Sequence, residues 1–240
     1  MKIDILGVRF DSLTKEDAVE TALGMLENGD KGYIVTPNPE IVWLCRSDER
    51  LKDIVNSAAL VLPDGIGIIY GAKILGRPLK SRIPGIDFIQ GVFDRLKGTG
   101  KKVFLFGAKP GVADAAAENL MDKYPGLKVV GTCDGYFDDD SVPIDKINKA
   151  KPDLLMVCLG CPKQEKWMAD NIGRIDVKLM VGLGGSLDVF AGTVQRAPEK
   201  WQKMGLEWLY RLIKEPKRIK RMIKLPAFVF AVIWQRIRGR

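Results

Sequence analysis

The sequence of 240 residues contains no histidine. This absence excludes the Ser-His-Asp and Cys-His classes of nucleophilic site, in which an imidazole takes the proton of the nucleophile. A general base in this chain must therefore be an aspartate, a glutamate, a lysine, a tyrosine or a cysteine.

Cysteine is scarce, with four residues in the whole chain. Cys158 and Cys161 form a CxxC pair, but no second pair and no histidine are present to complete a zinc site. Such scattered cysteines are typical of reduced thiols in a cytosolic protein. The acidic run Asp138–Asp140 lacks the spacing of a calcium-binding loop, so we expect a solvated loop there and no metal site.

Long hydrophobic runs are also missing. The opening segment MKIDILGVRFDSL carries acids where a signal peptide needs an apolar core, so we expect no leader. Near the C-terminus, LPAFVFAVIW has ten uncharged residues, whereas a transmembrane helix needs about 20. We therefore expect that this segment does not cross a bilayer.

What the sequence does contain is an uneven distribution of charge. Residues 196–240, called the tail below, carry 13 Lys/Arg and 3 Asp/Glu, a balance of +10. Residues 1–195, called the body, carry 25 Lys/Arg and 27 Asp/Glu, a balance of −2. This asymmetry indicates a polyanionic partner, either nucleic acid or an anionic membrane surface.

Short runs rich in Val, Ile and Leu alternate with helical patterns along the body. The expected helices are 14–29, 65–76, 84–97 and 111–123, and strand-like runs occupy 2–8, 32–36, 59–62, 101–107, 127–132, 153–160 and 177–185. Continuous apolar strands that alternate with helices are typical of a parallel sheet covered on both faces. We predict a Rossmann-like, mostly parallel α/β sheet sandwiched by helices in residues 1–195, followed by a basic helical appendage in residues 196–240.

Five of the turns that follow these strands are rich in glycine, proline and polar residues. They read TPNPE, PDGIG, GAKPG, GCPKQE and GLGGSLD. Glycine lets a ligand approach the backbone closely, and the N-terminus of a helix attracts phosphate. One such turn is ordinary in an α/β protein, but ligands bind outside the carboxyl ends of the strands in these sheets. Five turns at one edge therefore predict a binding crevice.

Asp64 is the leading candidate for chemistry. It follows an apolar strand and stands between Pro63 and Gly65, so its carboxylate is expected to project into the crevice as a general base. An N-cap of the helix 65–76 is the alternative interpretation, and the pattern alone leaves both open. The glycines after Asp64 would let a ligand come close to the carboxylate.

Two further segments offer polar side chains at helix starts. Arg82 precedes a helix N-terminus and suits a diphosphate, although a solvated arginine has the same pattern. Gln164 and Glu165 could bind sugar hydroxyls or the edge of a base, or simply begin a helix. GLGGSLD (182–188) resembles part of a dinucleotide fingerprint but comes late in the chain, which argues against a Rossmann dehydrogenase.

The tail has apolar and basic residues at helical spacing. Pro216 and Pro226 are expected to break it into short helices. A basic amphipathic helix with aromatic residues is typical of a segment that lies on anionic lipid. A helix packed on the body is the alternative, and nucleic-acid binding is disfavoured because no known motif accompanies the charge.

Six ordered blocks resemble the WecG/TagA/CpsF glycosyltransferase family. They are TPNPEIV, PDGIG, RIPGID, GCPKQE, VGLGGSLDVFAGTVQRAP and WLYRLIKEPKRIKR, and together they span nearly the whole chain. The resemblance implies an inverting transfer without a metal or other cofactor. N-acetylmannosamine would pass from its UDP donor to the 4-hydroxyl of N-acetylglucosamine on undecaprenyl diphosphate, in the linkage unit of wall teichoic acid. A related UDP-sugar, or a nucleotide-sugar binding protein without catalysis, remains the alternative.

The resemblance also assigns residues. Asp64 would be the general base. The substrate-binding set would be Thr36, Asn38, Arg82, Gln164, Glu165, Gly184 and Gly185. The tail would contact the donor diphosphate through Arg211, Arg218 and Arg221. It would also hold the protein at the inner face of the cell membrane, and a homo-oligomer is possible in solution.

Overall fold

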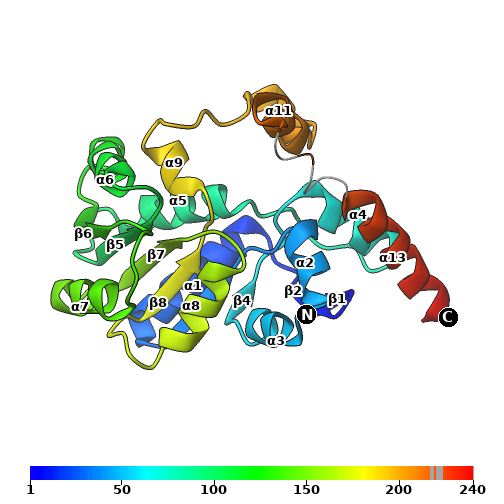
Figure 1. The fold of residues 1–240 in the computed structure, drawn as a ribbon, viewed down its shortest axis with the longest axis horizontal. Coiled ribbons are helices and arrows are strands. Elements are labelled where there is room, and N and C mark those ends of the chain that lie inside the picture. Colours follow the sequence, from blue (N-terminus) through cyan, green and yellow to red (C-terminus); the bar gives the residue numbers. More distant parts are fainter. Residues whose placement is uncertain (217–218, 220–223, 240) are drawn as a thin grey trace.

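The computed structural model describes residues 1–216, 219 and 224–239 as an α/β sandwich around a six-stranded parallel sheet (Figure 1). The order of the strands is β4-β3-β8-β7-β5-β6, and every neighbouring pair is parallel. The strands are β3 (Gly32–Val35), β4 (Leu60–Val61), β5 (Lys102–Gly107), β6 (Lys128–Cys133), β7 (Leu154–Cys158) and β8 (Leu179–Gly182). The predicted fold class is confirmed.

The apolar strands are buried on both of their faces. In β5, Phe104 and Phe106 pack into one hydrophobic cluster, whereas Val103 and Leu105 pack into the other. Successive side chains of a strand point to opposite faces of the sheet. A strand covered on both sides must therefore be apolar throughout, which explains the continuous runs in the sequence.

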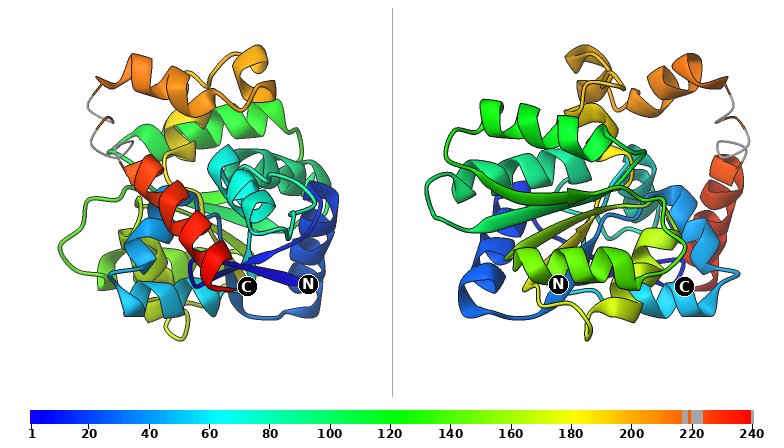
Figure 2. Two further views of the ribbon diagram at one scale, coloured as in Figure 1. Left: turned by 90° about the vertical axis from the view of Figure 1, so that its right-hand side faces the viewer. Right: turned by 60° about the vertical axis from the view of Figure 1, so that its left-hand side comes forward.

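Two layers of helices cover the sheet, as Figures 1 and 2 show. The helices that share a hydrophobic cluster on one face are α1 (Lys15–Asn28), α5 (Gly85–Leu96), α6 (Val112–Lys123) and α9 (Ser186–Phe190). Those on the other face are α2 (Pro39–Cys45), α3 (Glu49–Asn56), α7 (Ser141–Ala150) and α8 (Lys163–Asn171). Thr14 begins α1 with a full capping box to Asp17.

An N-terminal hairpin extends the second layer. β1 (Lys2–Ile5) and β2 (Val8–Asp11) are antiparallel, and both turn residues, Leu6 and Gly7, have positive φ. The sequence predicted the first strand but neither β2 nor α3. The hairpin contacts α4 (Ile66–Ile74), where Gly71 leaves room for Ile5 and for Phe228 of the tail.

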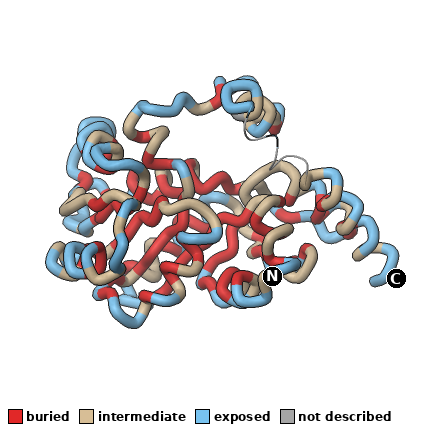
Figure 3. Tube along the Cα trace, viewed as in Figure 1, coloured by how far each residue is buried: buried red, intermediate tan, exposed pale blue. Residues whose placement is uncertain are grey.

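The tail contains α10 (Glu199–Lys203), α11 (Glu207–Lys214) and α13 (Lys224–Arg238). An exposed segment after α9 leads to α10 and α11, which stand apart from the sheet (Figures 1 and 3). In contrast, α13 packs on α4 and α2 and buries Phe228 and Val232. Gln235 accepts a hydrogen bond from the amide of Leu6 at 2.9 Å, and Arg236 donates to the carbonyl of Leu75 at 2.5 Å.

The prolines of the tail act differently from each other. α11 ends at Lys214, shortly before Pro216, as predicted. The break expected at Pro226 is wrong, because this proline lies in the first turn of α13, where a missing N–H costs no helical hydrogen bond. Within the described ranges we find no helix with the length and hydropathy of a transmembrane span. The division into a core and a separate membrane-associating appendage stays a prediction.

Candidate active site

The turns after β3, β4 and β8 meet at the carboxyl edge of the sheet, because these three strands are neighbours. Backbone hydrogen bonds tie two of the turns together and to the segment before α5. The amide of Asp64 donates to the carbonyl of Pro37 at 3.3 Å, and the amide of Ile83 donates to that of Pro63 at 2.9 Å. Asp64 is therefore fixed where the sequence placed it, just beyond a strand end.

Asp64 is not the N-cap of the helix that follows it. The N-cap of α4 is Gly65, at a φ of 86°, and no side chain caps the first turn. The glycines have a packing role that the sequence did not suggest. A Cβ on Gly67 would lie 2.7 Å from Cγ of Pro39, so the start of α4 packs directly against the start of α2. The cap interpretation is wrong, and the carboxylate belongs to the wall of a cavity.

A cavity of about 350 Å³, called the tail cavity, opens between the body and the tail. Its polar lining residues include Asn38, Asp64, Arg82 and Glu207. Its apolar lining residues are Ile66, Tyr70, Trp208, Leu225, Phe228 and Val229. Asn38 also caps α2 by accepting a hydrogen bond from the amide of Ile41. The tail cavity therefore combines charged and apolar groups in one lining.

A smaller cavity of about 90 Å³, called the strand cavity, adjoins it on the sheet side. Thr36, Gly185 and Ser186 are in its lining. The hydroxyl of Thr36 donates to the carbonyl of Gly182 at 3.1 Å. Asp64 and Glu207 are the two described residues that line both cavities. The two cavities thus meet at a pair of carboxylates, one from the body and one from the tail.

A third cavity of about 680 Å³, called the crevice, lies outside the carboxyl ends of β5 and β7. The chain leaves β5 towards β6 and leaves β7 in the opposite direction towards β8, so this is a topological switch point of the sheet. The lining includes Lys109, Tyr136, Lys163 and Asp188. Because Asp188 and Ser186 both belong to α9, one short helix borders the crevice and the strand cavity.

Gln164 and Glu165 are buried at the start of α8 and are not among the residues that line these cavities. Gln164 accepts a hydrogen bond from the amide of Gly184 and donates one to Glu165, both at 2.9 Å. Burial raises the pKa of Glu165, and no described residue makes a hydrogen bond to its second oxygen. In this structure the pair supports the backbone at Gly184, next to the cavity residue Gly185. Their assignment as substrate-binding residues stays a prediction.

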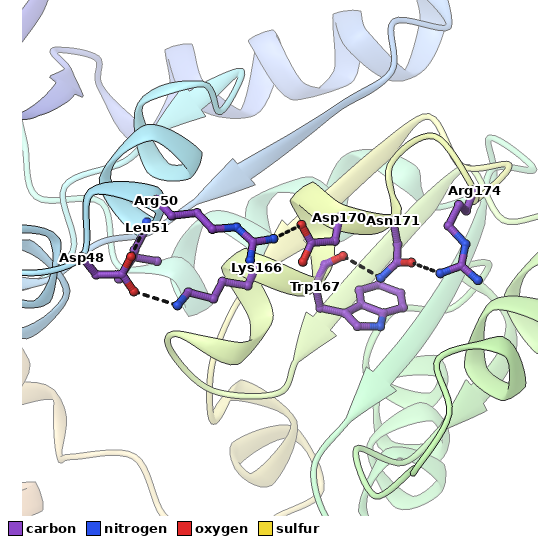
Figure 4. Close-up of polar contacts among 8 residues, drawn as sticks. All are labelled: Asp48, Arg50, Leu51, Lys166, Trp167, Asp170, Asn171 and Arg174. Carbon is purple, nitrogen blue, oxygen red and sulfur yellow. Dashed lines mark hydrogen bonds and ion pairs between the residues drawn. The ribbon is translucent and has the colours of Figure 1, made fainter.

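Ion pairs on the surface fix α8 against α3 (Figure 4). Lys166 contacts Asp48 at 2.7 Å, and Arg50 contacts Asp170 at 2.5 Å. The bond from Lys166 and the amide of Leu51 lower the pKa of Asp48. The helix that carries Gln164 is therefore held from outside as well as by its buried face.

The predicted cationic residues are only partly described. Arg82 shares the tail cavity with Asp64. Arg211 lies in α11, but its side chain falls outside the described part, as do Arg218 and Arg221 entirely. The described ranges contain no cluster of three or more Cys, Asp or Glu suited to a metal ion.

Four residues at or near these cavities were not predicted from the sequence, namely Tyr136, Asp188, Arg196 and Glu207. One signal for Glu207 was present, since it is one of only three acids in the tail. Asp87, an acid in the first turn of α5, accepts two hydrogen bonds from Arg196, at 2.5 and 2.8 Å.

Comparison with known proteins agrees with the resemblance of the six blocks. The model of the glycosyl transferase WecG/TagA/CpsF family matches residues 3–240. A Bacillus spizizenii protein named N-acetylglucosaminyldiphosphoundecaprenol N-acetyl-beta-D-mannosaminyltransferase is 38% identical over 208 residues, which cover 87% of this chain and 81% of that protein. A Staphylococcus aureus protein (strain MRSA252) of the same name is 36% identical over 234 residues, covering 96% and 92%.

Proposed function

The chain belongs to the WecG/TagA/CpsF family of glycosyl transferases, and from this premise we propose that it transfers N-acetylmannosamine from its UDP donor to the 4-hydroxyl of N-acetylglucosamine on undecaprenyl diphosphate. Two relatives that each match most of the chain bear the name of the N-acetyl-beta-D-mannosaminyltransferase that acts on this lipid. The product would be the lipid-linked disaccharide of the wall teichoic acid linkage unit.

One observation supports this proposal above the others: Asp64 stands where the tail cavity meets the strand cavity. In an inverting transfer, the acceptor oxygen attacks the anomeric carbon of the donor while a base takes the hydroxyl proton. The bond from that carbon to the diphosphate breaks, and its electron pair leaves with UDP. Asp64 is the proposed base, because a carboxylate at this junction can reach a hydroxyl from one cavity while the donor sugar occupies the other.

We assign the donor to the crevice and the strand cavity. Ligands of open α/β sheets bind at the topological switch point, which here is the crevice between β5 and β7. There Tyr136 offers an aromatic face for a base, and Lys109 and Lys163 offer positive charge. The N-terminal part of α9 leads from the crevice to the strand cavity, so the sugar would lie beside Asp64.

We assign the acceptor to the tail cavity, because its lining has groups for both parts of a lipid-linked sugar. Asp64 and Glu207 suit the hydroxyls of the sugar. The apolar lining residues suit the first prenyl units of the carrier. Arg82, with the tail arginines, would stabilise the charge that develops on the leaving diphosphate, so that no metal is required.

The exposed side of α13 supports docking to the inner face of an anionic membrane. Phe230 is 72% exposed and Trp234 is 56% exposed, and Arg236 and Arg238 lie at the end of the same helix. Aromatic and basic side chains on one helix are typical of an interfacial segment.

Sedimentation with anionic vesicles tests this docking. We expect the wild-type protein to sediment with the vesicles and the double variant Phe230→Ser/Trp234→Ser to stay in the supernatant. Retention on DNA that competes with the vesicles would instead indicate nucleic-acid binding, and a homo-oligomer stays a prediction.

A donor screen tests the function. The full chain is incubated with N-acetylglucosaminyl diphosphate on a prenyl lipid and, in turn, UDP-N-acetylmannosamine, UDP-N-acetylglucosamine and UDP-glucose, with and without EDTA. We expect transfer with a clear preference for the first donor and no effect of EDTA. Preference for another donor would replace the sugar in the proposal, and donor binding without any transfer would replace the enzyme by a binding protein.

A further inference from the structure

The first residue of the tail, Arg196, joins the body to α11 through a partly buried guanidinium. Its two terminal nitrogens donate to both oxygens of Asp87, at 2.5 and 2.8 Å, and its Nε lies 3.5 Å from a carboxylate oxygen of Glu207. Burial by itself would lower the pKa of Arg196, but the contacts with Asp87 and Glu207 raise it. The bidentate pair with Asp87 fixes the plane of the Arg196 guanidinium. The direction of its Nε–H bond, towards Glu207, is therefore fixed as well.

Glu207 is the residue to which Arg196 points. It is the first residue of α11, and its side chain is 12% exposed. Together with Asp64 it lines both the tail cavity and the strand cavity. At this junction the hydroxyl of the acceptor must meet the anomeric carbon of the donor, so a second carboxylate stands beside the reacting groups.

We propose that Glu207 is an acceptor-binding residue that accepts hydrogen bonds from the N-acetylglucosamine unit, and that Arg196 is the residue that positions it. This inference rests on the proposed function, since it names a contact to the acceptor of that reaction. A carboxylate that contacts a guanidinium is an acceptor of hydrogen bonds only, and sugar hydroxyls and the acetamido N–H are donors. Asp64 takes the proton, and Glu207 holds the sugar that loses it.

The contact between Nε of Arg196 and Glu207 is long enough for α11 to move closer when the acceptor binds. The ion pair at 3.5 Å is longer than a hydrogen bond, and the buried Nε of Arg196 makes no hydrogen bond within the described part of the chain. A buried donor without a partner is costly. A small movement of α11 towards Arg196 would satisfy the Nε, and an acceptor that binds Glu207 in this closed position would be favoured.

The test is steady-state kinetics of Glu207→Gln in the full chain, with a water-soluble farnesyl analogue of the acceptor. Losing a hydrogen bond to a charged group predicts an acceptor KM raised about tenfold or more, with donor KM and kcat within twofold. Glu199→Gln is the matched control, because this exposed glutamate on α10 pairs only weakly with Lys203 on the surface. The control should leave every constant unchanged.

The positioning role is tested by Arg196→Gln and by the double variant. We expect Arg196→Gln to raise the same acceptor KM, and Arg196→Gln/Glu207→Gln to raise it no further than the larger single effect. Arg196→Lys should restore part of the affinity for the acceptor, because lysine keeps the positive charge but cannot form the bidentate pair with Asp87. A merely structural clamp would instead raise both KM values and lower the thermal midpoint in proportion. That pattern, or an unchanged acceptor KM in Glu207→Gln, would overturn the inference.

Calorimetric binding of the acceptor analogue separates this inference from the proposed function. If the wild type transfers sugar and Glu207→Gln is unaffected, the function stands and the inference fails. Weaker analogue binding to Glu207→Gln, with no transfer by the wild type, would mean that the inference stands while the function fails. A wild type that neither transfers to the analogue nor binds it rejects both.

Discussion

The two walls of the tail cavity are held in different ways. The body wall, with Asp64, is fixed by backbone hydrogen bonds between turns that leave the buried sheet. The tail wall at α11 is held mainly by side chains, namely the Arg196 contacts and the packing of Gly205 on Ile66, where a Cβ would come within 3.0 Å. No described side chain of α11 is buried. The proposed base therefore stands on a rigid wall, while the opposite wall can adjust.

A second difference exists inside the tail itself. α13 is attached like a helix of the body, with Phe228 and Val232 in the hydrophobic core and polar ties to Leu6 and Leu75. Segments with few buried apolar contacts open most easily, so opening is expected at α10 and α11 rather than at α13. Within the tail, α13 is therefore firmly anchored to the body, whereas α10 and α11 can move more easily.

The largest expected effect is on the rigid wall. Asp64→Asn removes the proposed base and keeps the size of the side chain, so we expect kcat to fall roughly 10²- to 10⁴-fold. The thermal midpoint and donor binding should change little, because Asp64 caps no helix. Asp122→Asn, on the exposed side of α6, is the matched control. Activity within a few-fold of the wild type would move the base elsewhere.

The next effect tests the anchored end of the tail. Phe228 is 1% exposed, and Phe228→Ala should lower the free energy of unfolding by about 3–5 kcal/mol. Phe230→Ala, two residues away and mostly exposed, should change it by less than about 0.5 kcal/mol. Urea unfolding followed by circular dichroism measures both. Equal effects would show that α13 is attached as loosely as α11.

A third prediction concerns the support behind the rigid wall and depends on pH. Burial raises the pKa of Glu165 from its ordinary value of 4.5, so the folded state keeps a proton that the unfolded chain releases. The free energy of unfolding should therefore fall as pH rises from the unfolded pKa towards the folded one. Glu165→Gln removes this dependence, so the urea midpoint of this variant should rise relative to that of the wild type as the pH increases above 4.5.

The control for this prediction is Glu118→Gln on the exposed side of α6, which should follow the wild type at every pH. If Glu165→Gln also follows the wild type, the carboxyl group is not protonated in the folded state. The hydrogen bond from Gln164 would then be made to a buried anion.

The smallest effect is expected at the surface pair between α8 and α3. Lys166→Ala breaks the contact with Asp48 and should lower the thermal midpoint by at most about 3 °C. Asp48→Ala should lower it further, because Asp48 also caps α3 through the amide of Leu51. Equal midpoints for the two variants would mean that the cap contributes nothing measurable.

The sequence allowed most of the sheet and part of the site to be predicted. Apolar runs set the strands, and the rule that parallel strands share a carboxyl edge placed Thr36, Asp64 and Gly185 together. The order of the strands was beyond local patterns, so the crevice between β5 and β7 could not be located. α3 was missed although its amphipathic pattern is present in residues 49–56, with Leu51, Ile54 and Val55 on one buried face.

The remaining site residues depend on tertiary contacts that no local pattern carries. From the sequence, Gln164 and Glu165 are predicted to bind substrate or simply to begin a helix, but packing of α8 buries both, and Gln164 bonds to the backbone of Gly184. The triad of Arg196, Asp87 and Glu207 joins three separate segments. In the sequence these three residues resemble ordinary surface charges, because only the folded structure brings the tail next to the body.

The contact between Gln235 and Leu6 joins residues 229 positions apart and has a consequence for synthesis. The hairpin is synthesised before α13, the helix that completes its packing. At ordinary translation rates the apolar face of the hairpin and α4 waits on the order of 10 s for this cover. Contacts this distant in sequence also slow folding. The nascent chain is therefore expected to need chaperone protection until α13 has been made.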